Sequence, residues 1–207
     1  MHTALNYIRF CLKTCYIDYP NQLASINSYL SPAIEQTLFD TNAKYQGKLR
    51  LNSWEGLLPL LQTEPTIEAV FFYRLERLIF LDNPDNPLLP YLASVMRRRT
   101  GSEIYYSTEI GKGFNIQHGF GIVIGPRFKI GDNFVIHQGV TLGQKNTNSP
   151  NETITIGNNV TIFANASILG DITIGDNAKI GANSVLLKSV ESDAVYAGAP
   201  AKRISMK

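Results

Sequence analysis

The sequence predicts an α+β protein in which a helical first half precedes a β-helix built from hexapeptide repeats. Apolar residues recur at helical spacing in the first half, over residues 4–16 and 66–81. From residue 104 onwards, aliphatic residues recur at every sixth position instead. Neither an α-helix nor an alternating strand has a period of six, whereas the coils of a β-helix do. We therefore expect a helical domain over residues 1–99 and a β-helix domain over residues 100–207.

Three helices are expected in the first half, over residues 4–16, 66–81 and 88–99. Pro65 suits the first turn of the second helix, because the N–H that proline lacks would have no partner there. The run Asp-Asn-Pro-Asp-Asn-Pro over residues 82–87 then breaks the chain. The third helix ends in Arg97, Arg98 and Arg99, which suit its carbonyl end. A phosphate site is the alternative reading of this basic cluster.

The second half consists of hexads whose leading Ile or Leu should point inwards and stack on its counterparts in neighbouring coils. These residues are Ile104, Ile110, Ile116, Ile122, Ile124, Ile130, Ile136, Leu142, Ile156, Ile162, Ile168, Ile174, Ile180 and Leu186. Glycine follows many of them, where a corner needs a residue without a Cβ atom. Three hexads make a triangular coil, and coils stack at about the strand spacing of 4.8 Å. No coil can bury its face alone, so the array should fold as a unit.

Two interruptions of the period point to places where the β-helix changes shape. Near Gly121, Ile122 and Val123 the phase slips by two residues, which should bulge one corner and re-aim nearby side chains. Residues 144–155 are polar and irregular, so we expect them to leave the coil as a protruding loop. Loops that leave a rigid scaffold often carry binding groups.

Composition and charge argue against several classes of function. The chain has 207 residues and a formal net charge of +2, which is too small to indicate nucleic acid or an anionic membrane as partner. No uninterrupted apolar run reaches the roughly 18 residues of a spanning helix, and the start lacks the pattern of a cleavable signal. Cys11 and Cys15 lie four apart, where one helix turn cannot easily join them. We expect a reduced, cytoplasmic protein.

Several motifs resemble those of bacterial serine acetyltransferases. Residues 115–125, Asn-Ile-Gln-His-Gly-Phe-Gly-Ile-Val-Ile-Gly, resemble the DHGxGIVIG signature of that family. Residues 140–143 resemble its VTLGG motif, residues 197–202 its closing turn GxPAK, and residues 72–77 a helix reading YRxAH. The resemblance covers roughly residues 60–205. It implies a left-handed β-helix, acetyl-CoA as donor, and homotrimers with active sites between subunits; whether trimers pair stays open.

His118 is the expected general base. The chain has only three histidines, His2, His118 and His137, and acyl transfer to a hydroxyl needs a group such as neutral imidazole to take the proton. The resemblance gives this role to His118, and it implies that Glu103, where the family has an aspartate, orients the ring. A histidine that caps a corner of the coil is the alternative. No serine or cysteine nucleophile is evident, so we expect the acceptor to attack the thioester directly.

The resemblance also implies residues for binding acetyl-CoA. The candidates are Gly143, Gln144, Ala164, Ala182, Lys202 and Arg203. Gln144 stands where the family has a glycine whose N–H stabilises the thioester oxygen. Ala164 and Ala182 match small residues along which the pantetheine arm lies. Lys202 and Arg203 are candidates for the nucleotide phosphates, with solvated terminal charges as the alternative.

The acceptor side departs from the family. Residues 151–153, Asn-Glu-Thr, replace its Arg-His pair; Gln117 replaces the acidic residue before the histidine, and Pro126 replaces a glutamate. A serine zwitterion needs a cation for its carboxylate and an anion for its ammonium. Amides such as Gln117 and Gln138 instead suit an uncharged acceptor. We therefore favour O-acetylation of a sugar or saccharide precursor, of the capsule or exopolysaccharide type, over serine O-acetylation in cysteine biosynthesis.

Two further classes stay open at this point. A zinc hydrolase of the β-helix carbonic anhydrase type needs three converging histidines. His118 and His137 are close to one coil apart, but His2 lies at the terminus, so we expect no metal. A non-catalytic trimeric scaffold would fit the loss of the serine-binding residues, although His118, Glu103 and the closing turn are retained.

Overall fold

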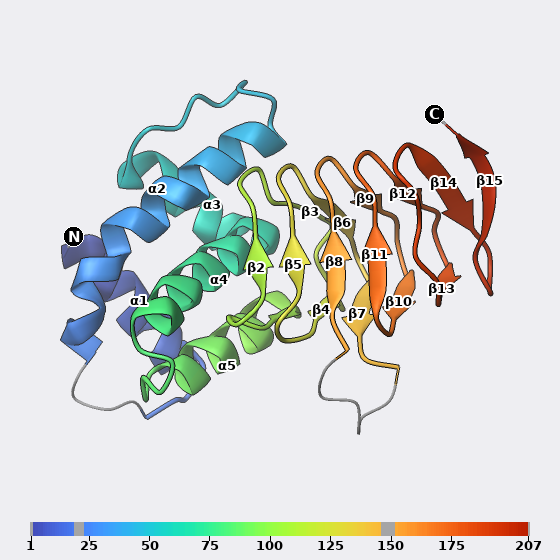
Figure 1. Ribbon diagram of the computed structural model, residues 1–207. Helices are drawn as coiled ribbons and strands as arrows, with labels where there is room; N and C mark the ends of the chain where they lie inside the picture. Colours follow the sequence, from blue (N-terminus) through green and yellow to red (C-terminus); the bar gives the residue numbers. More distant parts are fainter. Residues whose placement is uncertain (1, 19–22, 146–151, 207) are drawn as a thin grey trace. The chain divides into compact units, whose positions relative to one another are not determined.

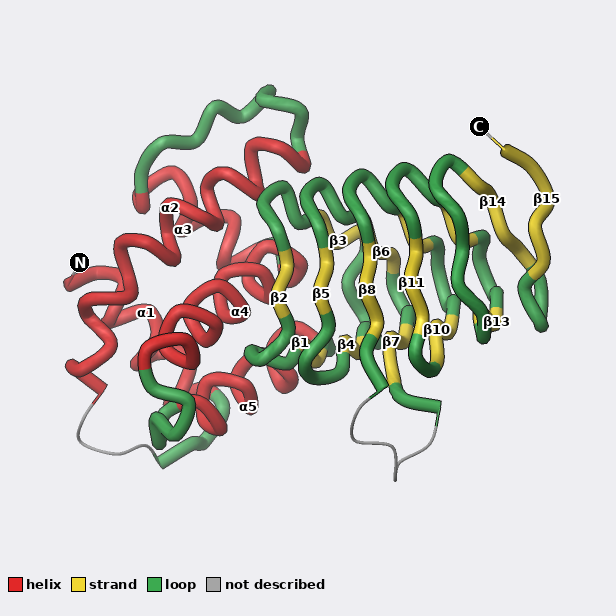
Figure 2. Tube along the Cα trace, in the orientation of Figure 1, coloured by secondary structure: helices red, strands yellow, loops and turns green. Residues whose placement is uncertain are grey.

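The computed structural model describes residues 2–18, 23–145 and 152–206. The chain forms two compact units, Met1–Gly101 and Ser102–Lys207. The first unit is helical and the second is a parallel solenoid of short strands, as the red and yellow segments of Figure 2 show. The predicted class, an N-terminal helical domain followed by a left-handed parallel β-helix, is confirmed. Among the helices within the described ranges, none is both long and apolar enough to cross a membrane.

The first unit contains more helices than the sequence predicted. Its helices are α1 (His2–Thr14), the 3₁₀ helix η1 (Leu23–Ile26), α2 (Asn27–Lys44), α3 (Trp54–Thr63), α4 (Pro65–Asp82) and α5 (Leu89–Thr100). The elements α1, α4 and α5 confirm the three predicted helices, and Pro65 occupies the first turn of α4. Helices α2 and α3 are additional. Only Glu64 separates α3 from α4.

Helix α4 forms the core of the helical unit, and most of its residues are buried. Phe71 of α4 packs against Tyr7 of α1 and Trp54 of α3, with ring centroids 6.4 and 6.0 Å apart. The Arg74 Nε of α4 donates a hydrogen bond to Asp40 Oδ2 of α2 at 2.8 Å. Burial of two charges is tolerated where they pair at such short range. Contacts from three other helices thus explain why α4 carries apolar residues on almost every side (Figure 1).

The β-helix passes through three sheets in turn. Its strands are β1 (Glu103–Ile104), β2 (Glu109–Ile110), β3 (Asn115–Gln117), β4 (Val123–Ile124), β5 (Lys129–Ile130), β6 (Val135–His137), β7 (Thr141–Gly143), β8 (Ile154–Ile156), β9 (Thr161–Ile162), β10 (Ser167–Leu169), β11 (Ile172–Ile174), β12 (Lys179–Ile180), β13 (Val185–Leu186), β14 (Ala194–Ala197) and β15 (Lys202–Met206). The sheet orders are β1-β4-β7-β10-β13, β11-β8-β5-β2 and β15-β14-β12-β9-β6-β3. Every third strand therefore joins the same sheet, as β2, β5, β8 and β11 show in Figure 1.

The periodic aliphatic residues line the interior, as the six-residue period predicts. Ile116, Ile136 and Ile162 align in register across β3, β6 and β9, and each is almost fully buried. Phe114 and Phe134 stack in successive coils with ring centroids 6.0 Å apart and planes 9° from parallel. Burying one such aliphatic or aromatic side chain stabilises a fold by about 1.5–3 kcal/mol. Because the residues of one coil bury those of the next, the coils depend on one another.

At the corners after β5, β8 and β11, a glycine is followed two positions later by an asparagine. A Cβ atom on Gly131 would lie 2.9 Å from a main-chain atom of the following coil, and one on Gly175 would lie 2.4 Å from such an atom. These glycines are needed for close approach, since neither has a positive φ. Two residues after each of them, Asn133 and Asn177 have φ near +56° and +60°. Asparagine tolerates the left-handed region better than most residues.

The end of the β-helix differs from its coils. Strand β15 pairs antiparallel with β14, and Ala197 lies opposite Lys202. The expected protruding loop at residues 144–155 falls partly outside the described residues, which omit 146–151. At its described edge, the Lys145 N–H donates to Glu152 Oε2 at 2.6 Å.

Candidate active site

One corner of the β-helix gathers His118 and several of the other candidate residues. We call it the histidine corner; it follows β3, β6, β9 and β12 and comprises residues 117–121, 137–139, 163–165 and 181–183. Gln117 pairs in register with His137. One coil further, the Asn165 N–H donates to the Gln138 carbonyl at 2.9 Å. Residues far apart in the sequence therefore form one ridge along this edge.

The first coil of this corner contains a two-residue insertion. Six positions separate the inward-facing Ile116 from Ile122, whereas four separate Ile136 from Val140 in the next coil. The pairs are aligned, because β3 pairs with β6 and the Val123 N–H donates to the Val140 carbonyl. The phase slip in the sequence thus corresponds to two extra residues between β3 and β4.

The insertion pushes His118 out of the coil. Its φ is +63°, and Gly119 and Gly121 also have positive φ. The Gly119 N–H donates to the Gln117 carbonyl at 2.9 Å, and the Phe120 N–H donates to the His118 carbonyl at 3.0 Å. A left-handed conformation is uncommon at non-glycine residues in general, but corner residues of this chain such as Asn165 and Asn183 share it, so it marks His118 as a corner residue. The His118 side chain is exposed.

His137 lies beside His118 on the same ridge. The two imidazole centroids are 6.5 Å apart, and the His137 ring is 5.1 Å from the ring of Phe163, with planes tilted by 34°. Burial, and secondly the neighbouring His118, lower the pKa of His137 below its usual value. Both causes disfavour the charged ring, so His137 is neutral at neutral pH.

Glu103 precedes the insertion in the first coil. It lies on β1, pairs in register with Val123 of β4, and is half-buried. The adjacent Ser102 Oγ donates to the carbonyl of Gly119, inside the insertion. Glu103 and the inserted turn are therefore local neighbours, and the Glu103–His118 dyad stays a prediction.

The two candidate acceptor amides flank the histidines. Gln117 Nε2 donates to Asn115 Oδ1 at 3.0 Å. Gln138 follows His137, and its Oε1 is buried without a hydrogen-bond partner among the described residues. A buried acceptor without a donor is costly. This oxygen is therefore a candidate to accept a hydrogen bond from a ligand.

The candidate coenzyme residues divide between different parts of the β-helix. Ala164 and Ala182 occupy the histidine corner in adjacent coils, where the Asn183 N–H donates to the Ala164 carbonyl at 2.8 Å. Gly143 ends β7 and Gln144 follows it, so both lie at the next corner, across one face of the coil. Within one chain, the β-helix does not bring these two pairs together.

The last two candidates, Lys202 and Arg203, lie on β15. Arg203 Nη1 forms an exposed ion pair with Glu191 Oε1 at 3.2 Å. The Tyr196 hydroxyl donates to the other oxygen of Glu191 at 2.9 Å. Exposed ion pairs contribute at most about 1 kcal/mol, so this pair does not prevent Arg203 from binding a phosphate.

Comparisons with known proteins agree with this architecture. The bacterial transferase hexapeptide family (six repeats) matches residues 153–188. The serine acetyltransferase of Neisseria gonorrhoeae is 30% identical, with a TM-score of 0.73 over 96% of this chain and 69% of that one. A serine acetyltransferase in complex with cysteine is 31% identical, with a TM-score of 0.76 over 88% and 74% of the two chains.

The chain belongs to the serine acetyltransferase-like hexapeptide-repeat acyltransferases.

The serine acetyltransferase of Brucella abortus strain S19 in complex with coenzyme A also resembles this acyltransferase. It is 27% identical, and the match covers 98% of this chain and 75% of that one with a TM-score of 0.74. Among curated proteins, no sequence matches significantly.

From the sequence, His137 of this acyltransferase was a candidate only for binding zinc. The structure confirms that it approaches His118, but no group of three His, Cys, Asp or Glu side chains within the described residues could hold a metal ion. Phe163 was missed altogether. Its signal was present, since the hexad register places Phe163 after Ile162 just as His137 follows Ile136.

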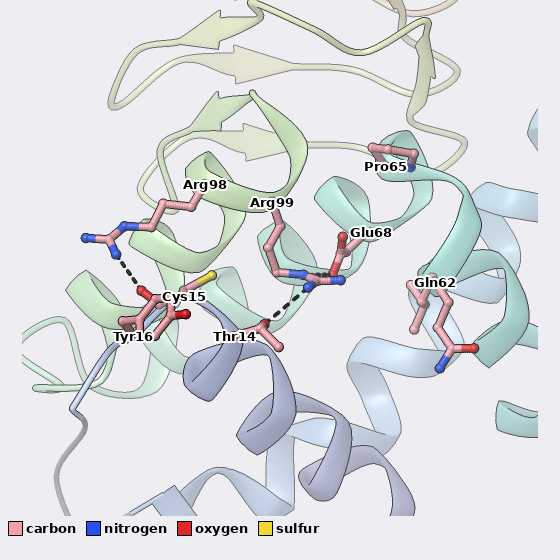
Figure 3. A pocket seen from close by; sticks show the side chains of 9 residues that line it. Thr14, Cys15, Tyr16, Gln62, Pro65, Glu68, Arg98 and Arg99 are labelled. Carbon is pink, nitrogen blue, oxygen red and sulfur yellow. Dashed lines mark hydrogen bonds and ion pairs between the residues drawn. The ribbon is translucent and has the colours of Figure 1, made fainter.

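The basic cluster of this acyltransferase has a structural role in the helical unit. Arg98 and Arg99 line a pocket of about 510 Å³ (Figure 3). Arg98 Nη1 donates to the Cys15 carbonyl, and Arg99 donates to Glu68 Oε1 and to Thr14 Oγ1. The arginines thereby join the end of α1 to α4 and α5, which favours the structural alternative over a phosphate site.

Proposed function

We propose that this acyltransferase transfers the acetyl group of acetyl-CoA to a hydroxyl of a sugar or saccharide precursor, with His118 as general base. The donor, acetyl-CoA, is that of the family. The observation that carries the proposal is the insertion that holds His118 out of the coil, on the same ridge as Ala164 and Ala182. Small side chains at these two positions leave room along the ridge for a pantetheine arm.

In this mechanism His118 moves one proton twice. Its neutral imidazole takes the proton of the acceptor hydroxyl as that oxygen attacks the thioester carbonyl. When the carbon–sulfur bond breaks, the imidazolium returns the proton to the departing thiolate, so the base is regenerated. Glu103 has the role of a positioning residue, because a carboxylate beside the ring holds one tautomer and stabilises the imidazolium. No covalent enzyme intermediate is required.

A homotrimer supplies the remainder of the site in this proposal. Gly143 and Gln144 lie at a different corner from His118. Packing of three β-helices side by side would bring the Gly143 corner of one subunit to the histidine corner of its neighbour. A main-chain N–H there, from Gln144, would stabilise the oxyanion that develops on the thioester oxygen.

Neutral side chains near His118 support a sugar as acceptor. Gln117 and Gln138 are amides, and the buried Gln138 Oε1 is without a donor among the described residues. Burial and the neighbouring His118 lower the pKa of His137, which favours an uncharged ring. Uncharged hydroxyl groups suit these partners better than the carboxylate of an amino acid does.

Serine O-acetylation is the second candidate, and the structural neighbours favour it. Solved structures that resemble this chain include serine acetyltransferases, and one from Neisseria gonorrhoeae is in complex with serine. Under this alternative, residues outside the family's Arg-His pair would bind the serine carboxylate.

Thiol release from acetyl-CoA tests the proposal, with L-serine, sugars and nucleotide sugars as acceptors. We expect turnover with a sugar, and His118→Ala should lower kcat by about 10²–10⁴-fold, the usual contribution of a general base. Lys129→Ala, on an exposed position of β5, is the matched control and should leave kcat unchanged. Calorimetry should show that His118→Ala still binds CoA.

Other outcomes would contradict specific parts of the proposal. Turnover with serine alone would establish the second candidate. An active His118→Ala variant would exclude His118 as the base. No CoA binding by the wild-type protein would favour the non-catalytic scaffold.

A further inference from the structure

We infer that His137 binds a second hydroxyl group of the acceptor, next to the one that His118 deprotonates. The acceptor would therefore carry two neighbouring hydroxyls, as sugars do and serine does not. This inference rests on the proposed function, because it requires His118 to act on the acceptor. It assigns a specificity-determining residue, since His137 takes no part in the proton transfer itself.

The geometry places the two imidazoles as a pair. His118 follows β3 and His137 ends β6, and the two strands pair in register from Asn115 to Gln117. The ring centroids are 6.5 Å apart, with planes at 48°. Hydrogen bonds from ring nitrogens to hydroxyl oxygens span about 2.8–3.0 Å. Two tilted rings at this separation can therefore each reach one of two neighbouring hydroxyl oxygens.

Phe163 holds His137 in place from the following coil. The two rings lie 5.1 Å apart and are tilted by 34°, a separation at which aromatic pairs attract. The Phe163 N–H is itself bound to the Ile180 carbonyl at 2.9 Å, which ties this residue to the rigid coil. Phe163 is 36% exposed. Its exposed surface beside the imidazole of His137 offers an apolar patch for the C–H face of a sugar ring.

The chemistry around His137 suits a hydroxyl and not a carboxylate. A neutral imidazole has one nitrogen that donates a hydrogen bond and one that accepts. A hydroxyl group can likewise both donate and accept, so the two groups match. Burial, followed by the proximity of His118, lowers the pKa of His137 and so disfavours the imidazolium, which is the form that binds a carboxylate most strongly. The adjacent Gln138 Oε1 is a buried acceptor without a partner among the described residues. It could accept the proton of the same hydroxyl.

A purely structural role for His137 makes a different prediction. In that case its only function would be to pack against Phe163, and any flat ring would replace it. His137→Phe preserves an aromatic ring at this position and removes both nitrogens. The variant therefore separates hydrogen bonding from packing.

The test compares an accepted sugar with its deoxy analogue, which lacks the neighbouring hydroxyl. For the wild-type protein we expect the deoxy analogue to have a kcat/KM about tenfold lower or more. For His137→Phe we expect both acceptors to be turned over with equal kcat/KM, because the hydroxyl has lost its partner. The change should appear mainly in the acceptor KM, and the KM for acetyl-CoA should not change. Thr155→Val, on β8 in another sheet, is the control.

Each outcome has one meaning. If His137→Phe still discriminates between the two sugars as the wild type does, the inference is wrong, although His118 and the sugar acceptor would stand. If all deoxy analogues react as well as the parent sugar in the wild type, the inference is also wrong. If only serine is acetylated, the acceptor proposal fails first, in the acceptor panel, and this inference falls with it.

Discussion

At the scale of single residues, the protein shows how burial decides the charge of a side chain. Glu76 of α4 is fully buried, and neither of its carboxyl oxygens has a hydrogen-bond partner among the described residues. Burial raises the pKa of Glu76 well above its usual value, and Arg97 offsets only part of this effect. The carboxyl group is therefore protonated in the folded protein at a pH where it is ionised in the unfolded chain.

This difference predicts how stability depends on pH. Between the unfolded and the folded pKa of Glu76, the folded state binds more protons, so the free energy of unfolding falls as the pH rises. Glu76→Gln should remove this decline and stabilise the protein at pH 8 by about 1 kcal/mol, with little effect at pH 4. Urea unfolding at both pH values measures it. The exposed Glu109→Gln is the control, and an equal effect of Glu76→Gln at both pH values would contradict the prediction.

His118 and His137 also differ in burial, since the side chain of His118 is exposed and that of His137 is half-buried. His118 protrudes on an insertion, while His137 follows an inward-facing residue of β6 and packs on Phe163. Sequence motifs identify the first, because the family signature is local. The second lies outside that signature: the spacing of about one coil places it near His118, but its contact with Phe163 depends on which coils become neighbours.

At the scale of elements, the glycine corners set how closely coils can stack. A Cβ atom on Gly175 would lie 2.4 Å from the main-chain nitrogen of Ser192 in the next coil. Main-chain atoms cannot move aside without breaking the ladder, so overpacking of this kind is destabilising. On Gly143 the same atom would lie 3.5 Å from a side-chain methyl of Leu169, an ordinary contact.

The two glycines therefore give a matched pair of variants. Gly175→Ala should destabilise the protein by about 1–3 kcal/mol, whereas Gly143→Ala should change the free energy of unfolding by less than about 0.5 kcal/mol. Chemical unfolding followed by circular dichroism measures both. Equal stability of the two variants would mean that the coils can separate at the corner after β11.

The helical elements show where a periodic pattern becomes hard to read. The buried face of α2 includes Thr37, Asp40 and Thr41 beside Leu30 and Ala33. Half-polar faces of this kind have no clear apolar stripe. Asp40 is buried because it pairs with Arg74, a contact that lies thirty-four positions away in the chain and is invisible to a local pattern.

At the scale of the whole molecule, the proposed site is divided between two corners, and this has a consequence for assembly. His118 lies at one edge of the β-helix and Gln144 at another. A homotrimer with sites between subunits therefore predicts complementation between variants that damage different edges. His118→Ala removes the base, and Gln144→Pro removes the main-chain N–H.

Each of these two variants alone should be inactive. Mixed trimers, formed by unfolding and refolding the two variants together, should regain activity, because some sites combine an intact His118 with an intact Gln144 N–H. Analytical ultracentrifugation verifies the trimer, and thiol release measures the activity. Mixed trimers that stay inactive would show that both residues act within one subunit or that the site lies elsewhere.

The sequence alone determined the β-helix and its proposed base, whereas the tertiary structure decided what surrounds that base. Each hexad specifies its own inward residue and corner, so a period of six is readable without knowing any long-range contact. The DHG-like signature around His118 is equally local.

The neighbours of His118 depend on a different kind of information. His137, Phe163 and the unpartnered Gln138 Oε1 meet on one ridge only because coils of unequal length are aligned by their hydrogen-bond ladders. The insertion before Ile122 and the longer stretch of sequence between β7 and β8 change the number of residues per coil, and so change which side chains stack. Local sequence patterns determine where strands and turns form. Which side chains of neighbouring coils come into contact depends instead on the backbone hydrogen bonds between coils, because these bonds fix the register of every strand pair.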